Sequence, residues 1–169
     1  MTMEEAIKTA LDYETRIRDI YRNAAEAVSD PAGKRIFQML RDDEQHHVEY
    51  LMDRLELWEK TGKLSEKKLE STIPPVDNIQ REMEKVRAHM SPGNRSGERD
   101  ILSKALKAEI ETSNFYEKMV AELPDEGQRM FARFLEIEEN HIAAVQIELD
   151  YITKTGYWFD FKEFDMEDL

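Results

Sequence analysis

Two short motifs in this chain of 169 residues combine Glu and His at the spacing of metal ligands. The segments Glu44–His47 and Glu138–His141 each place a Glu three residues before a His. A single Glu stands 30 residues before the first motif, at Glu14, and 29 residues before the second, at Glu109. Residues three apart share one face of a helix. Two Glu-x-x-His helices facing two Glu helices form the ligand set of a two-metal site, and the pattern predicts such a site.

The residues around the two motifs repeat as well. Tyr21 and Tyr116 each follow the upstream Glu by seven residues, and Phe37 and Phe131 each precede the Glu of the motif by seven. A Glu-x-x-His pair alone is weak evidence in a chain this rich in Glu, so the repetition strengthens the prediction. Self-similarity at a spacing of about 95 residues indicates two copies of one helical hairpin.

Apolar residues at three- and four-residue spacing predict that the chain is all-α, with four long helices. We expect these helices over residues 3–28, 31–60, 97–123 and 126–155. Capping and stop residues flank them, namely Thr2 with Glu5, Asp30 with Pro31, Gly62 and Gly156. If each hairpin is antiparallel, the four Glu residues of the pattern lie about 15 residues from a turn. All four carboxylates then meet near the middle of the helices.

A long connector, at about residues 61–96, separates the two hairpins. Within it, a short helical stretch is expected near residues 78–90. Neighbouring antiparallel helices need only a short loop, so this length predicts a crossover along a four-helix bundle. The bundle would span residues 1–156, followed by a tail at residues 157–169 in which aromatic and acidic residues alternate. The tail either folds back onto the bundle or docks onto a partner.

The composition limits the possible functions. A net charge of −13 and a pI of about 4.8 argue against nucleic acid and anionic membrane surfaces as partners. No apolar run approaches the ~20 residues that span a bilayer, and the first residues do not form a signal peptide, so we expect a cytoplasmic protein. The sequence holds no Cys, so metal ligands must be carboxylates and imidazoles.

Four buried carboxylates would be costly without a cation to balance them. We therefore expect two divalent ions, with iron as the first choice for mixed oxygen and nitrogen ligands and Mn or Zn as alternatives. Glu44 and Glu138 are expected to bridge the two ions, because they are central on facing helices. The remaining ligands are expected to bind one ion each, namely Glu14, His47, Glu109 and His141. The alternative is a buried hydrogen-bonded network without metal.

Other polar residues near the motifs have different interpretations. Tyr21 and Tyr116 are either core residues with a satisfied hydroxyl or catalytic residues near the metals, acting as hydrogen-bond donors or short-range electron donors. His46 points about 100° away from its neighbour His47, which predicts a position at the surface or next to the ligands, but not a metal ligand. Glu148 is expected at the edge of the bundle.

The chain resembles the ferritin-like di-iron carboxylate superfamily and, within it, the rubrerythrin-like proteins. The resemblance rests on residues already quoted and on a few more, namely Tyr13-Glu14, Glu44 with His47, Glu109 with Tyr116, Glu138 with His141, and the ending Gly156–Phe161. It implies a ferritin-like four-helix bundle and a carboxylate-bridged di-iron centre that reduces hydrogen peroxide to water. It also implies a cytoplasmic role in oxidative stress and a homodimer.

Two departures from the rubrerythrin pattern keep other functions open. Rubrerythrins carry a Cys-ligated rubredoxin-like domain, which this chain lacks, so any electron donor must be a separate protein. Thr112 stands where they carry a second Glu, so the ligand set resembles the symmetric six-ligand pattern of bacterioferritins. The alternatives are a ferroxidase or iron-handling protein, and a redox-silent scaffold that is held by its metals and acts through its tail.

Overall fold

The computed structural model describes residues 1–65, 67–85 and 96–159, and every regular element in these ranges is an α-helix. The helices are α1 (Met3–Ala27), α2 (Pro31–Thr61), α3 (Val76–Lys85), α4 (Ser96–Glu122) and α5 (Asp125–Thr155). The all-α prediction is confirmed, and each end of the four long helices falls within one residue of the expected position. The described helices include none that is long and apolar enough to cross a membrane.

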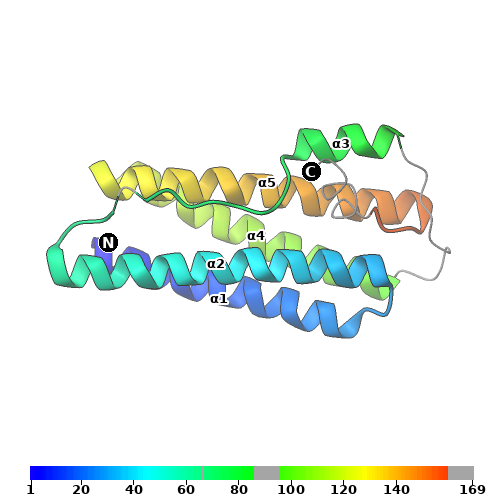
Figure 1. Cartoon of the computed structure of the whole chain (residues 1–169), viewed down its shortest axis with the longest axis horizontal. Coiled ribbons are helices and arrows are strands. Elements are labelled where there is room, and N and C mark those ends of the chain that lie inside the picture. The colour runs from blue at the N-terminus through cyan, green and yellow to red at the C-terminus, as the bar shows by residue number, and fades with distance from the viewer. Residues whose placement is uncertain (66, 86–95, 160–169) are drawn as a thin grey trace.

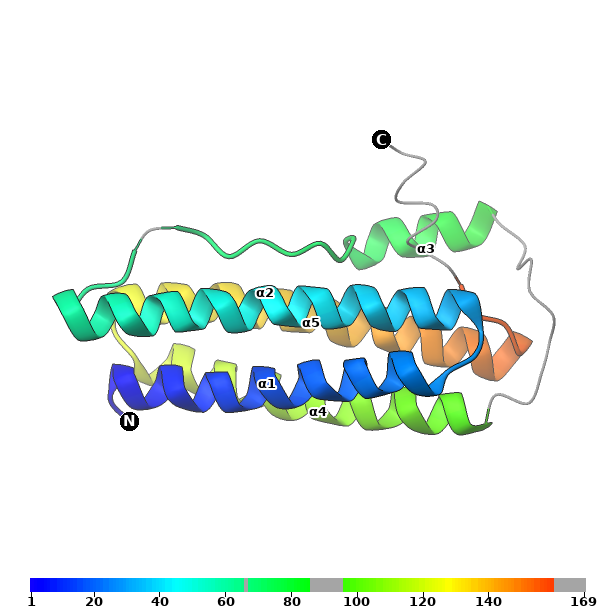
Figure 2. The ribbon, with the colours of Figure 1, turned by 60° about the horizontal axis from the view of Figure 1, so that its bottom comes forward.

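The four long helices lie side by side (Figure 1). The helices α1 and α2 form one antiparallel hairpin, and α4 and α5 form the other. The helix α1 also packs against α4, while the short α3 packs against α5 (Figure 2). Residues 67–75, which we call the strap, run along the outer side of α2 and α5 (Figure 2). The strap and α3 therefore cover the side of the helices that is opposite α1 and α4.

The expected capping residues explain where the helices begin and end. The Thr2 side chain accepts a hydrogen bond from the Glu5 amide, and the Glu5 carboxylate accepts one from the Thr2 amide. The Asp30 carboxylate accepts hydrogen bonds from two amides in the first turn of α2. Gly62 and Gly156 follow α2 and α5 with φ angles of 68° and 75°, a left-handed conformation that favours glycine. These local signals confirm the sequence-based boundaries.

The hydrophobic core forms two clusters, and each long helix contributes to both. One cluster contains Tyr21, Phe37 and Leu102, and the other contains Ile7 and Phe131. Along every long helix, the predicted metal ligands lie between the residues of the two clusters. The apolar clusters thus enclose a polar layer from both ends.

Trp158 and Phe159, in the described part of the tail, fold back onto the helices. The indole Nε1 of Trp158 donates a hydrogen bond to Glu98 at 2.7 Å, and its ring packs edge-on against Phe37. The Phe159 amide donates a hydrogen bond to Glu148 at 3.2 Å. The prediction that Glu148 lies at the bundle edge is therefore wrong, since this side chain is 1% exposed and lies beneath the returning chain. Tail residues 160–169 lie outside the described part.

Candidate metal centre

The structure brings all six predicted ligands together in the polar layer, and each is fully buried. They come from the middle of the four long helices: Glu14 from α1, Glu44 and His47 from α2, Glu109 from α4, and Glu138 and His141 from α5. The side chains form two groups of four whose donor atoms lie within 4.8 Å of one another, and Glu44 and Glu138 belong to both groups. The geometry therefore offers two adjacent positions for a cation, with two carboxylates that reach both.

The carboxylates in this layer have oxygen atoms that receive no hydrogen bond. These atoms are one oxygen each of Glu14, Glu44 and Glu109, and both oxygens of Glu138. A buried acceptor without a partner is unfavourable, and more so when it is charged. A divalent cation is the partner that such oxygens and imidazole nitrogens suit. The buried residues could thus hold metal ions.

Both imidazole rings direct Nδ1 toward the carboxylates. Nδ1 of His47 lies 3.2 Å from Glu44 and 3.5 Å from Glu14. Nδ1 of His141 lies 2.8 Å from Glu44 and 3.5 Å from Glu109. The two rings stack with their centroids 5.5 Å apart. Nδ1 is therefore the nitrogen that each ring could offer to an ion in the layer.

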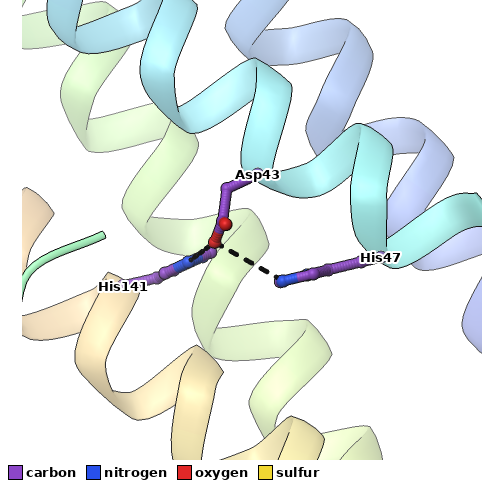
Figure 3. A group of neighbouring side chains, drawn as sticks. All are labelled: Asp43, His47 and His141. Carbon is purple, nitrogen blue, oxygen red and sulfur yellow. Dashed lines mark hydrogen bonds and ion pairs between the residues drawn. The ribbon is translucent and has the colours of Figure 1, made fainter. Parts of the chain in front are cut away.

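The Asp43 side chain is an unpredicted part of the centre. Its Oδ2 lies 2.7 Å from Nε2 of His141 and 3.4 Å from Nε2 of His47, so one carboxylate contacts both rings (Figure 3). The strap holds this carboxylate in place, because Ser71 and Thr72 donate hydrogen bonds to it. A hydrogen bond to the second nitrogen of a metal-binding imidazole fixes its tautomer and orientation.

The sequence contained a signal for Asp43 that the repeat concealed. Asp43 stands four residues before His47, on the same helical face, but the corresponding position of the second motif is Ile137. Asp43 and the two imidazoles also have the spacing of a metal site of their own. An ion on the Nδ1 side of the rings would nevertheless have more carboxylate ligands. Four carboxylates lie on that side, whereas among the described residues only Asp43 lies at Nε2.

The two predicted tyrosines contact the outer carboxylates in a reciprocal arrangement. The Tyr21 hydroxyl on α1 donates a hydrogen bond to Glu109 on α4 at 2.7 Å. The Tyr116 hydroxyl on α4 donates one to Glu14 on α1 at 2.5 Å. Burial and the neighbouring carboxylates raise the pKa of both tyrosines well above its ordinary value. Both hydroxyls are therefore neutral donors that orient Glu14 and Glu109.

The four Glu residues divide into two kinds. Burial and the negative charges around them raise the pKa of Glu44 and Glu138 well above the ordinary value. Burial also opposes the charge of Glu14, but the nearby Glu44 and His47 side chains and the hydrogen bond from Tyr116 lower its pKa to about 2. The pKa of Glu109 is lowered in the same way against burial. The surroundings thus favour the charged form of the outer carboxylates and the protonated form of the two shared ones.

Burial disfavours the charged form of His47 and His141, but the surrounding carboxylates outweigh it and raise the pKa of each ring well above its ordinary value. Burial opposes the charge of Asp43, but the hydrogen bond from His141 and the nearby ring of His47 lower its pKa below the usual range. Without a cation, the layer therefore contains charged imidazolium groups beside charged carboxylates.

Two further positions bear on the ligand set. Thr112 is buried, and its hydroxyl donates to the Ala108 carbonyl of its own helix at 2.8 Å. The α4 position that faces the centre one turn after Glu109 thus carries no carboxylate. His46 is exposed, as expected.

Comparison with known protein families, with curated proteins and with solved structures found no match for this chain. The case for a function therefore depends on the chemistry of the buried layer.

Proposed function

We propose that the chain is a di-iron oxidoreductase built on a ferritin-like four-helix bundle, with a long crossover between α2 and α4. Its reaction would be rubrerythrin-like, the reduction of hydrogen peroxide or oxygen. The observation that carries this proposal is the pair of four-residue ligand groups that share Glu44 and Glu138. A shared pair of carboxylates between two imidazole-bearing positions is the arrangement expected of a bridged two-metal site.

Each residue of the layer has a distinct role in this proposal. Glu44 and Glu138 would be shared by the two ions, while Glu14 with His47 and Glu109 with His141 would complete the two positions. When bound, two ferrous ions supply the two electrons that, with two protons, convert one hydrogen peroxide to two water molecules. The apolar clusters at both ends of the layer exclude bulk water and strengthen the electrostatic interactions inside it.

Tyr21 and Tyr116 support the outer ligands in this proposal. Each donates a hydrogen bond to one oxygen of a terminal carboxylate. The other oxygen of that carboxylate then remains for an ion. Their hydroxyls are also the oxidisable groups that contact the ligand set, and a role as short-range electron donors stays a prediction. In this proposal sustained turnover needs an electron donor outside these residues, because they contain no Cys that could hold an iron–sulfur site. The proposed working form is a homodimer.

A ferroxidase or iron-handling function is the second candidate, and Thr112 favours it. The hydroxyl of Thr112 is bonded to its own helix, so the ligand set stays at six residues and is symmetric between the two positions. A seventh ligand, in the form of a further carboxylate, would let one ion change its ligand on oxidation, and this chain has none at that position.

Anaerobic loading with Fe(II), followed by rapid mixing with hydrogen peroxide or with oxygen, tests the proposal. We expect two irons per chain and a near-ultraviolet absorbance that rises much faster with peroxide. A faster reaction with oxygen would favour the ferroxidase, and no reaction with either would leave a redox-silent metal protein.

Matched variants connect this result to the site. Glu138→Ala and His47→Ala should lose iron, whereas the exposed neighbours allow the controls Glu139→Ala and His46→Ala, which should keep it. Unchanged iron content in Glu138→Ala would refute the proposed centre.

A further inference from the structure

A cleft of about 370 Å³ lies outside the metal centre, between the beginning of the strap and the first turns of α5. Its apolar part comes from Leu69, Met130 and the ring of Tyr50. The other lining residues are polar or charged, namely Ser65, Lys67, Lys68, Glu126, Arg129 and Arg133. This volume is within the range of pockets that hold small molecules.

The charge of this cleft is opposite to that of the chain. Among the described residues, four cationic side chains and one carboxylate line it, whereas the whole chain has a net charge of −13. Arg133 has distant counterions, with Glu136 at 3.4 Å and Glu70 at 3.8 Å. Within the described part of the chain, Lys67, Lys68 and Arg129 form no ion pair. Three cationic groups at the cleft thus have no counterion among the residues that the structure describes.

Hydrogen bonds hold the walls of the cleft in place. The Tyr50 hydroxyl donates to the Lys67 carbonyl at 2.6 Å, and Arg133 Nε donates to the Leu69 carbonyl at 2.9 Å. Just before the strap, the Leu64 amide donates to the Glu126 carboxylate at 3.0 Å. These contacts connect the strap to α2 and α5, so the shape of the cleft is formed before any ligand binds.

A buried guanidinium adds positive charge behind one wall. Arg54 is 7% exposed, and its Nε and Nη1 have no hydrogen-bond partner. Its guanidinium lies 4.9 Å from the centre of the Tyr50 ring, which lines the cleft. No described carboxylate pairs with Arg54. A buried charge without a counterion is unfavourable, and an anion bound in the cleft beside Tyr50 would reduce that cost.

We propose that this cleft binds a multiply charged phosphate group, either free or carried on a small organic molecule. Arg and Lys side chains are the usual ligands of phosphate oxygens, and Lys67, Lys68 and Arg129 are available for that role. The apolar surface of Leu69 and Met130 would contact an organic part of the ligand. The site is separate from the metal centre, and the proposal does not depend on the nature of the metal.

Isothermal titration calorimetry tests the proposal with inorganic phosphate, pyrophosphate and ADP as ligands. The full chain is used at low salt with EDTA present, so that no bound metal contributes. We expect pyrophosphate and ADP to bind more tightly than inorganic phosphate, with affinities that weaken as salt rises. Tighter binding of ADP than of pyrophosphate would identify an organic phosphate, and equal binding would identify the free anion.

The double variant Lys67→Glu with Arg129→Glu should weaken this binding by about tenfold or more. Both side chains are exposed, so the fold should survive, and circular dichroism checks this. A matched control reverses two exposed charges on α1 and α4, Arg16→Glu with Lys118→Glu, and should bind as the parent does. No binding to the parent at millimolar ligand, or equal losses in the two double variants, would overturn the proposal.

Discussion

Metal binding to the buried layer should release about four protons for every two divalent ions. Without a cation, the raised pKa values of Glu44, Glu138, His47 and His141 favour the form of each group that carries the proton. Metal ligands must be deprotonated, so two carboxyl and two imidazole protons must leave as the two ions bind.

The net charge of the buried layer supports the release of four protons. Before binding, three charged carboxylates, those of Glu14, Glu109 and Asp43, face two imidazolium groups, which leaves one net negative charge. After binding, five carboxylates face two divalent ions and two neutral rings, which again leaves one. Exchange of four protons for two divalent ions therefore keeps the buried charge constant, and this avoids the cost of a changed charge in a low-dielectric interior.

The size of the pH effect on metal affinity follows from the release of two protons for each bound ion. The apparent affinity for each ion should rise by about 100-fold per pH unit near neutrality, which corresponds to about 2.7 kcal/mol. Calorimetric titration with Zn²⁺ in two buffers of different ionisation enthalpy measures the released protons directly. Release of one proton or fewer for two bound ions would refute the assigned protonation states, even if both ions bind.

Three further outcomes are expected. Asp43→Asn should weaken binding of Zn²⁺ by about 10- to 100-fold, because the imidazoles lose the carboxylate that orients them, while Asn at the exposed Asp42 should have no effect. The metal-free protein should lose thermal stability as pH rises through the raised folded-state pKa values of Glu44 and Glu138. A melting temperature that is constant or rises from pH 6 to pH 9 would contradict this. Trp158→Ala should lower the free energy of unfolding by about 3–5 kcal/mol, since a fully buried ring is removed. Urea denaturation measures that change, and a loss below about 1 kcal/mol would mean that the tail residue does not support the fold.

The helices and the six candidate ligands could be predicted because their signals are local in the sequence. A Glu-x-x-His pair places two side chains on one helical face whatever surrounds the helix, and Gly62 and Gly156 end helices through their own conformation. The burial of Glu148 could not be predicted in this way. It depends on where the chain returns after α5, and the Phe159 amide that contacts Glu148 is part of that return.

The strap explains why other features were missed. The strap is irregular and carries no repeating pattern of apolar residues, so nothing in residues 67–75 indicates that they lie along α2 and α5. The contacts of Ser71 and Thr72 with Asp43, and the cleft formed with α5, exist only after that packing. A tertiary arrangement of this kind has no counterpart in spacing or propensity.

Asp43 makes the centre less symmetric than its ligands suggest. The six candidate ligands repeat between the hairpins, but the carboxylate that contacts both imidazoles comes only from α2, and Ile137 occupies the equivalent position on α5. Because Ser71 and Thr72 hold that carboxylate, the orientation of both rings depends on the strap. A strap that detached would leave a buried charge beside the imidazoles without its hydrogen-bond donors, which is costly. We therefore expect that the strap and the metal centre lose their structure together.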